Sequence, residues 1–288
     1  MNDPVELAPY RFAALVAPAV DRICLGVLRA AGAAGRPELD RRYGGPAATG
    51  FLVDLRTRLA VPGGTVSGPG FAAVTRYADP ARCQRALDKQ VAHGMIYRTA
   101  GGGLCATERG VAYLTEIAEL HARVTERLWD GHRARVTRLV GTVGRLLVRA
   151  ARPAPADGTD PATGAHRSGP TDPVGAAGEP DEPTWSDQWA REAGSAFHAL
   201  GPPYEPDGTP AGVLLLNRLS TLRYHRADAH AAAWTAAGHT ARSISALPDG
   251  PERRAIELET DRRAAGPYRA IAPTERLELL ADLAALPG

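Results

Sequence analysis

Residues 79–117 contain, in order, the signals of a helix, a tight β-hairpin and a second helix, and this order constrains the fold more than any other part of the chain. Asp79 followed by Pro80 is typical of a helix start, because an Asp side chain caps the first turn and Pro suits its first position. Gly94 suits the left-handed residue that follows a helix. Residues 95–98 and 104–107 favour short strands around an Ala-Gly-Gly-Gly turn. Thr107 then begins the second helix.

The first of these helices has two chemically different sides. Its apolar residues Ala81, Leu87 and Val91 are expected on one side. The other side is expected to carry Arg82, Arg85, Lys89 and Gln90. The pattern therefore predicts an exposed basic face immediately before the hairpin.

The segment LDKQVAHGMIYRTAGGGLCATERGVAYL resembles the part of MarR-type winged-helix regulators that runs from the recognition helix through the wing to the first dimerisation helix. The resemblance implies that the basic helix enters a DNA major groove while the hairpin, the wing, touches the minor groove or the backbone. The glycine tip of this wing departs from the family, in which an Arg often stands there; only Arg98, at the base, is basic. The residues expected to contact double-stranded DNA are Arg76, Arg82, Gln84, Arg85, Lys89 and Arg98.

The charge distribution agrees with a nucleic-acid partner. The whole chain carries a net charge of only +2, but residues 1–150 hold 21 basic and 13 acidic residues, a net +8. Residues 151–210 have a net charge of −7 and residues 211–288 of +1. Contacts to phosphates dominate non-specific DNA affinity, so a basic excess on the first segment suits a DNA-binding domain. The alternative is an arginine-rich composition that reflects only the source genome.

Two further long helices are expected after the hairpin, because apolar residues recur at helical spacing over 111–128 and 136–147. An earlier apolar helix is expected over 10–31, a second helical segment near 47–59, and a short helix over 67–77 before the basic one. In the regulator family such long helices pair across a two-fold axis, which implies a homodimer and a palindromic operator. The alternative is that they pack on the C-terminal part of the same chain.

The chain divides into three segments. Residues 1–150 are expected to form a winged-helix DNA-binding and dimerisation domain, and residues 185–288 a helical sensing or interaction domain. Residues 151–184 are rich in Pro, Gly, Ala, Asp and Thr and predict a disordered linker, since they bury too little apolar surface to offset ordering entropy. The expected fold is mainly α, a winged helix-turn-helix with a small β-hairpin wing, long flanking helices and a C-terminal helical domain.

The densest group of potentially chemical side chains in the C-terminal part is Tyr224, His225, Asp228 and His230. His225 and His230 are five residues apart, about 140° around a helix, so they do not both bind one metal ion without outside ligands. Two interpretations remain open: a buried network in which Arg223 or Arg226 pairs with Asp228, or the wall of a pocket for a small-molecule effector.

The stretches LRYHRADAHAAAWTAAG and AIELETDRRAAGPYRAI resemble the C-terminal helical region of a poorly characterised actinobacterial family. The resemblance implies an all-helical fold for this part and no reaction.

The sequence contains no motif that predicts catalysis or a cofactor. GxSxG, a Walker loop and a GxGxxG motif after a strand are all absent, and the three cysteines have no metal-binding spacing. No run of residues approaches a transmembrane helix, and no signal peptide is recognised, so we expect a cytoplasmic protein with no membrane partner, no metal and no catalytic residue. The predicted function is a DNA-binding transcriptional regulator that responds to a small molecule. The alternative is a helical ligand-binding protein or enzyme whose winged helix is a structural or protein-contact module.

Overall fold

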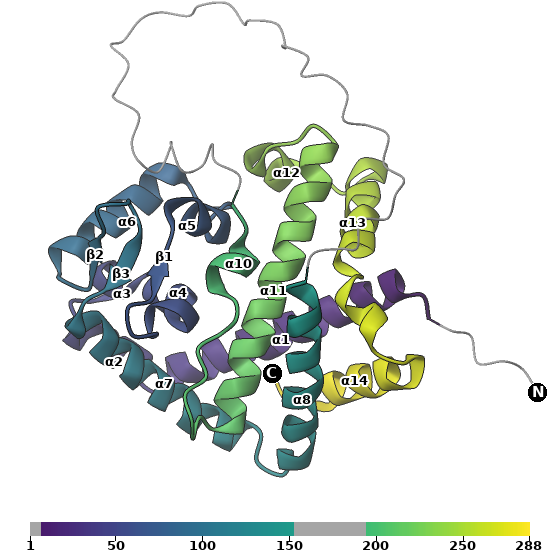
Figure 1. The fold of residues 1–288 in the computed structure, drawn as a ribbon, viewed down its shortest axis with the longest axis horizontal. Helices are drawn as coiled ribbons and strands as arrows, with labels where there is room; N and C mark the ends of the chain where they lie inside the picture. The colour runs from purple at the N-terminus through teal and green to yellow at the C-terminus, as the bar shows by residue number, and fades with distance from the viewer. Residues whose placement is uncertain (1–6, 153–193) are drawn as a thin grey trace, which may run out of the picture.

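The computed structural model describes residues 7–152 and 194–288, which are mainly helical with one small antiparallel sheet (Figure 1). The helices before residue 153 are α1 Pro9–Ala33, α2 Arg36–Arg42, α3 Pro46–Thr49, α4 Leu52–Leu59, α5 Gly68–Val74, α6 Pro80–Ala92, α7 Glu108–Leu128 and α8 Arg133–Ala150. The helices after residue 193 are α10 Ala196–Leu200, α11 Ala211–Ala236, α12 Ala241–Ala246, α13 Pro251–Ala264, the 3-10 turn η1 Pro267–Ala270, and α14 Pro273–Ala285. Within the described residues no helix combines the length and apolarity needed to cross a membrane.

The sheet consists of β1 (Thr65–Val66), β2 (Ile96–Arg98) and β3 (Leu104–Ala106) in the order β1-β3-β2. Both neighbouring pairs are antiparallel, and Cys105 lies opposite both Thr65 and Tyr97. In the turn between β2 and β3 the Thr99 N–H donates to the Gly103 carbonyl over 2.8 Å, and Gly102 has a φ of +77°. Positive φ is the reason glycine suits this turn. The predicted hairpin is confirmed.

Helix α6 begins and ends where its local signals predict. The Asp79 carboxylate accepts a hydrogen bond from the Arg82 N–H at 2.7 Å, and Pro80 is the first helical residue. Gly94, with a φ of +64°, follows the helix. The predicted division into two faces was wrong in part: Ala81 and Val91 are exposed, and Gln90 is buried.

The buried face of α6 consists instead of Cys83, Leu87 and Gln90. Their spacing of four and three residues follows one side of a helix. Gln90, which was expected on the basic side, therefore lies on the buried side of the helix.

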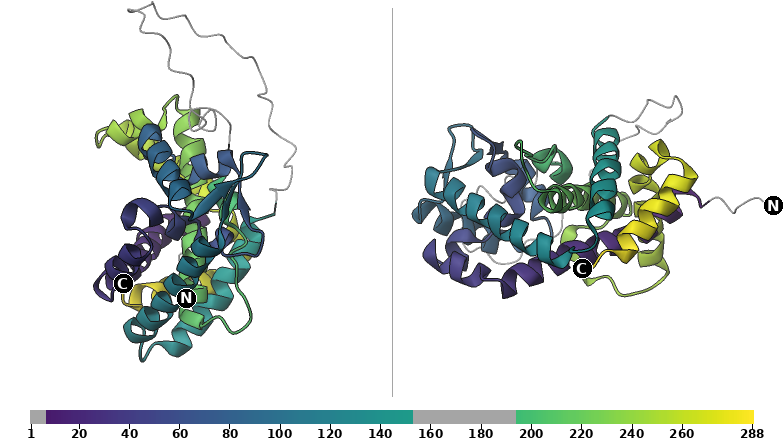
Figure 2. Two further views of the ribbon diagram at one scale, coloured as in Figure 1. Left: turned by 90° about the vertical axis from the view of Figure 1, so that its left-hand side faces the viewer. Right: turned by 90° about the horizontal axis from the view of Figure 1, so that it is seen from below.

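Helix α11 lies between the region of α4–α6 and the sheet on one side and α8, α13 and α14 on the other (Figures 1 and 2). It packs against α8, α13, α1, α10 and α7. The apolar faces of α7 and α8 thus contact a helix of the same chain. This packing corresponds to the alternative given for these two helices, in which they pack on the C-terminal part of their own chain and do not pair across a two-fold axis.

One hydrophobic cluster contains residues from both sides of the undescribed segment 153–193, including Ile23 of α1, Leu139 of α8 and Leu219 of α11. Its members are at most 9% exposed. Residues 153–184 of the predicted linker and residues 185–193 of the predicted C-terminal domain lie outside the described residues, so the division into three segments stays a prediction.

Candidate functional sites

Helix α6 presents three basic side chains on one exposed face. Arg82, Arg85 and Lys89 are separated by three and four residues, so they project from the same side of the helix. All three are exposed, and within the described part of the chain none of them forms an ion pair or a side-chain hydrogen bond. The helix lies at the outer edge of the molecule (Figure 1). The three charges are therefore available to an external anion.

Two other residues predicted to contact DNA meet at the edge of this face. The Asp88 carboxylate accepts hydrogen bonds from Gln84 Nε2, at 2.9 and 3.0 Å, and from Arg98 Nη2, at 2.8 Å. Arg98 stands on β2, so this contact joins the base of the hairpin to α6. Asp88 also adds one negative charge to an otherwise basic face.

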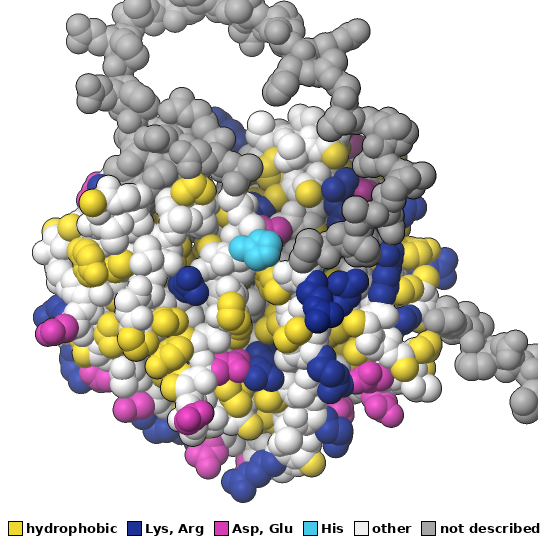
Figure 3. All heavy atoms as spheres, in the orientation of Figure 1, with side chains coloured by type: hydrophobic (Ala, Val, Ile, Leu, Met, Phe, Trp, Pro, Cys, Tyr) yellow, Lys and Arg dark blue, Asp and Glu magenta, His cyan; other side chains and the backbone are white. Residues whose placement is uncertain are grey.

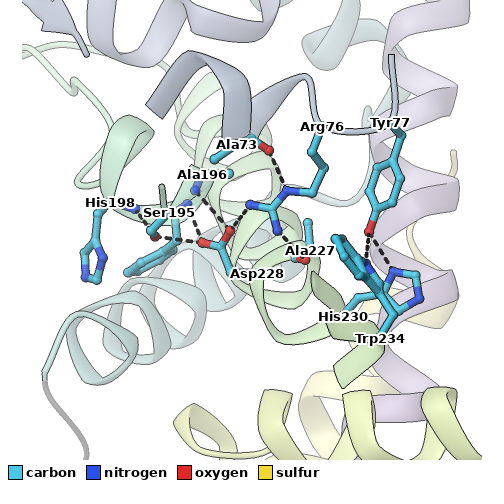
Figure 4. A network of polar contacts seen from close by, with 11 residues as sticks. Ala73, Arg76, Tyr77, Ser195, Ala196, His198, Ala227, Asp228, His230 and Trp234 are labelled. Atoms are coloured by element: carbon cyan, nitrogen blue, oxygen red, sulfur yellow. Dashed lines mark hydrogen bonds and ion pairs between the residues drawn. The ribbon is translucent and has the colours of Figure 1, made fainter. Parts of the chain in front are cut away.

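Arg76 lies away from the α6 face. Its Nη2 forms an ion pair with Asp228, and its Nε and Nη1 donate to the carbonyls of Ala73, at 2.7 Å, and Ala227, at 3.2 Å (Figure 4). Its side chain is only 11% exposed. A guanidinium whose donors are used inside the protein does not fit the DNA contact expected from the sequence.

Asp228 accepts four hydrogen bonds and connects α11 to α10 and to the turn between α5 and α6. Besides Arg76, the donors are Ser195 Oγ at 2.7 Å, the Ala196 N–H at 3.0 Å and the Phe197 N–H at 2.9 Å. The two amides belong to the first turn of α10, where N–H groups have no partner within the helix. Asp228 of α11 therefore caps α10 and holds Arg76, which lies in the turn between α5 and α6 (Figure 4).

The predicted partners of Asp228 were wrong. Arg223 Nε donates to Asp21 at 2.5 Å, and Arg226 pairs with Asp261 at 2.6 Å and with Glu257 at 3.3 Å. Asp228 does pair with an arginine, but that arginine is Arg76, which lies 152 residues earlier in the sequence. These contacts of the Asp228 oxygens all lie within the protein, which favours the network interpretation of this residue.

His230 takes part in a second short network. The Trp234 indole N–H donates to the Tyr77 hydroxyl at 3.3 Å, and the same hydroxyl is hydrogen-bonded to His230 Nδ1, 2.7 Å away, with the donor set by the tautomer of the ring. The other ring nitrogen of His230 is Nε2. This atom has no hydrogen-bond partner among the described residues, and Glu257 Oε1 lies 3.6 Å away. Burial lowers the pKa of His230, which favours the neutral ring.

Tyr224 and His225 are mostly enclosed by protein. The His225 ring packs edge-on against Phe197 with 5.5 Å between ring centres, and burial lowers the pKa of His225. Burial also raises the pKa of the Tyr224 phenol, with a smaller contribution from Asp54. Both side chains are neutral at physiological pH.

A cavity of about 400 Å³ lies between α1, the end of α5, α11 and α13. Tyr224, His225 and His230 line it, whereas Asp228 does not. The structure thus brings together three of the four residues predicted as a ligand site. The α1 wall, which includes Val16 and Val20, was not predicted, because apolar residues at helical spacing indicate only a packed core.

The described residues contain no group of three or more His, Cys, Asp or Glu side chains placed to hold a metal ion. Cys24, Cys83 and Cys105 are buried free thiols, and burial raises the pKa of Cys24 and of Cys83. A raised pKa makes a thiol a poor nucleophile at neutral pH.

Comparisons of the chain with protein-family models, with curated proteins and with solved structures found no match. The functional argument therefore rests on the residues and their geometry.

Proposed function

We propose that this protein is a DNA-binding transcriptional regulator that places α6 in the major groove. The observation that carries the proposal is the exposed face of Arg82, Arg85 and Lys89, none of which forms an ion pair within residues 7–152 and 194–288. Arg and Lys in such positions contact phosphates and the acceptor edge of guanine.

The order of elements around α6 supports the same function. Helix α5 ends at Val74, a short turn leads to α6, and the β2–β3 hairpin follows, with β1 on the outer edge of β3. This order resembles that of a winged helix-turn-helix, in which the second helix reads DNA bases and the hairpin lies beside the backbone. Arg98, at the base of the hairpin, is exposed and is the residue proposed to meet that backbone, where a phosphate would compete with Asp88 for its guanidinium.

Several arginines elsewhere on the molecule are engaged by acidic side chains. Arg138 pairs with Asp282 at 2.8 Å, and Arg145 pairs with Glu275. Figure 3 shows basic and acidic side chains interspersed over the lower part of the face that carries α8 and α14. Paired charges attract a polyanion weakly, so the α6 face is the better candidate for DNA.

The proposal includes a homodimer, since a two-fold pair of α6 helices suits a palindromic operator. The apolar faces of α7 and α8 pack on helices of the same chain, α1 and α4 with α11 for α7 and α14 with α11 for α8, so the proposed contact between subunits uses another surface. Sedimentation of the full chain with and without a selected duplex tests this part.

The main experiment first selects duplexes from a random pool with the full-length protein and then measures their affinity by fluorescence anisotropy. Arg85→Ala and Lys89→Ala are the test variants. A lost base contact is expected to cost about 1–3 kcal/mol on the selected sequence alone, whereas a lost phosphate contact weakens all sequences and lowers the salt slope by about 1.

Arg127→Ala is the matched control. Arg127 is an exposed arginine near the C-terminal end of α7, and its side chain donates a hydrogen bond to the Arg123 carbonyl of the same helix. The substitution removes the same charge and is expected to leave DNA affinity unchanged. If no sequence is enriched, or if both α6 variants bind like the unaltered protein, the protein is a ligand-binding protein or an enzyme and α6 is not a recognition helix.

A further inference from the structure

We propose that the cavity between α1, α5, α11 and α13 binds a neutral, mainly apolar small molecule with one hydrogen-bond-accepting group. This inference concerns binding alone and does not rest on the proposed DNA function. It goes further than the predicted effector site, because it names the walls of the site and the charge of the ligand.

The size and the walls of the cavity suit such a molecule. Its volume of about 400 Å³ falls in the range of about 300–1,000 Å³ typical of small-molecule sites. Ala13, Val16, Ala17 and Val20 of α1 form one apolar wall, and Leu222 of α11 and Tyr268 of η1 face the same space. An apolar ligand gains free energy there in proportion to the area that it removes from water.

The charged residues around the cavity are already paired with one another. Arg223 is matched by Asp21, and Arg226 by Asp261 and Glu257. The third lining arginine, Arg76, is matched by Asp228. A charged ligand would lose its hydration without finding an unmatched counter-charge, which is unfavourable in a partly buried site. The cavity therefore selects against ions of either sign.

Arg223 is the donor that remains for a neutral acceptor. Only its Nε donates to Asp21, and among the described residues its two terminal nitrogens have no recorded acceptor. The side chain is 39% exposed, which places the guanidinium at the mouth of the cavity. A carbonyl oxygen of the ligand accepts from these N–H groups while the apolar part lies against α1.

The cavity also borders the segment that leads to α6. Tyr77 lines it and stands three residues before Pro80, the first residue of α6. A bound molecule would contact this connection directly.

The test uses two probes with the same ring system, 2-acetylnaphthalene as the neutral ketone and 2-naphthoate as the anion, titrated into the full chain by calorimetry. We expect saturable one-to-one binding of the ketone and at least about tenfold weaker binding of the carboxylate. Arg223→Gln, which removes two of the donors, is expected to weaken ketone binding by about five- to tenfold.

Ala17→Phe fills the cavity and is expected to abolish ketone binding, while Ala134→Phe, at an exposed position of α8, retains it. Thermal melts check that both variants fold, and Ala17→Val, with a smaller side chain, is expected to weaken binding partially if the Phe variant does not fold. The proposal is overturned if neither probe binds, if the carboxylate binds as tightly as the ketone, or if binding to the folded cavity-filling variant is unchanged.

Discussion

Arg76 and Asp228 form an ion pair that joins the segment before α6 to the centre of α11, although 152 residues separate them in the sequence. The side chains are 11% and 23% exposed, so water screens the pair only weakly. The same carboxylate caps α10. One aspartate thus connects the proposed DNA-binding region to the helices that follow residue 193.

Asp228→Asn is expected to lower the free energy of unfolding by about 3 kcal/mol, because Arg76 stays mostly buried without its counter-charge and the neutral amide accepts fewer of the four hydrogen bonds. Urea unfolding of the full chain measures the loss. The double variant with Arg76→Met should lose less than the sum of the single variants. Asp88→Asn, in the exposed pair with Arg98, is the control and should change stability by no more than about 0.5 kcal/mol. Equal effects of the two Asp→Asn variants would contradict the role of Asp228.

Asp88→Asn is expected to raise DNA affinity, in contrast to the losses expected for Arg85→Ala and Lys89→Ala. The change removes the negative charge that stands among the cations of α6 and breaks the ion pair with Arg98. More favourable phosphate interactions should also increase the salt slope, by up to about 1. Anisotropy titrations at two salt concentrations measure both quantities. A fall in affinity would show that Asp88 positions Arg98 or Gln84 for a contact.

His121 is expected to make the protein sensitive to acid. It is only 1% exposed, and burial, with the nearby Arg56 and Arg36, lowers the pKa of His121 to about 3. The unfolded chain binds a proton at this residue below about pH 6.5, whereas the folded protein binds it only near pH 3. The free energy of unfolding therefore falls as the pH drops through this window, by up to about 1.4 kcal/mol per pH unit.

His121→Leu should remove this contribution. The Nε2 of His121 has no hydrogen-bond partner among the described residues, so the substitution is expected to leave stability at pH 7 unchanged or slightly higher. Urea unfolding at pH 7 and pH 5 then shows a smaller loss for the variant than for the unaltered protein. An identical loss in both would assign the acid sensitivity to other groups.

Gly26→Ala is expected to destabilise the protein by about 1–2 kcal/mol, although Ala is normally favoured over Gly in a helix by about 1 kcal/mol. A Cβ at Gly26 would lie 2.0 Å from the backbone of Gly288, so the end of the chain would have to move. That movement breaks the 2.9 Å hydrogen bond from Trp129 Nε1 to the Pro287 carbonyl. Thermal melts and the Trp129 indole N–H resonance report it.

Gly32→Ala in the same helix is the control, because the new Cβ would have no atom within 4 Å outside its own stretch of helix. It should leave the melting temperature unchanged or slightly higher. If Gly26→Ala behaves in the same way, the contact between α1 and the chain end contributes little.

The sequence alone determined the elements whose signals are local. The bounds of α6 follow from the Asp79 cap, Pro80 and Gly94, and the β2–β3 hairpin follows from its glycine turn. Capping bonds and the φ angles of turns involve residues a few positions apart, so they operate wherever the segment lies in the fold. The helical period likewise places Arg82, Arg85 and Lys89 on one exposed face of α6.

Only the tertiary structure decided which residues from distant helices meet. The pairing of Arg76 with Asp228, the burial of Gln90 and the packing of α8 on α11 depend on how whole helices are arranged, and the pattern of one helix does not encode the identity of its partner. The cavity is the clearest case. Val16 and Val20 have the same helical periodicity as Ile23 and belong to the same buried cluster, so the sequence pattern does not show that they also border a cavity, which α5, α11 and α13 complete.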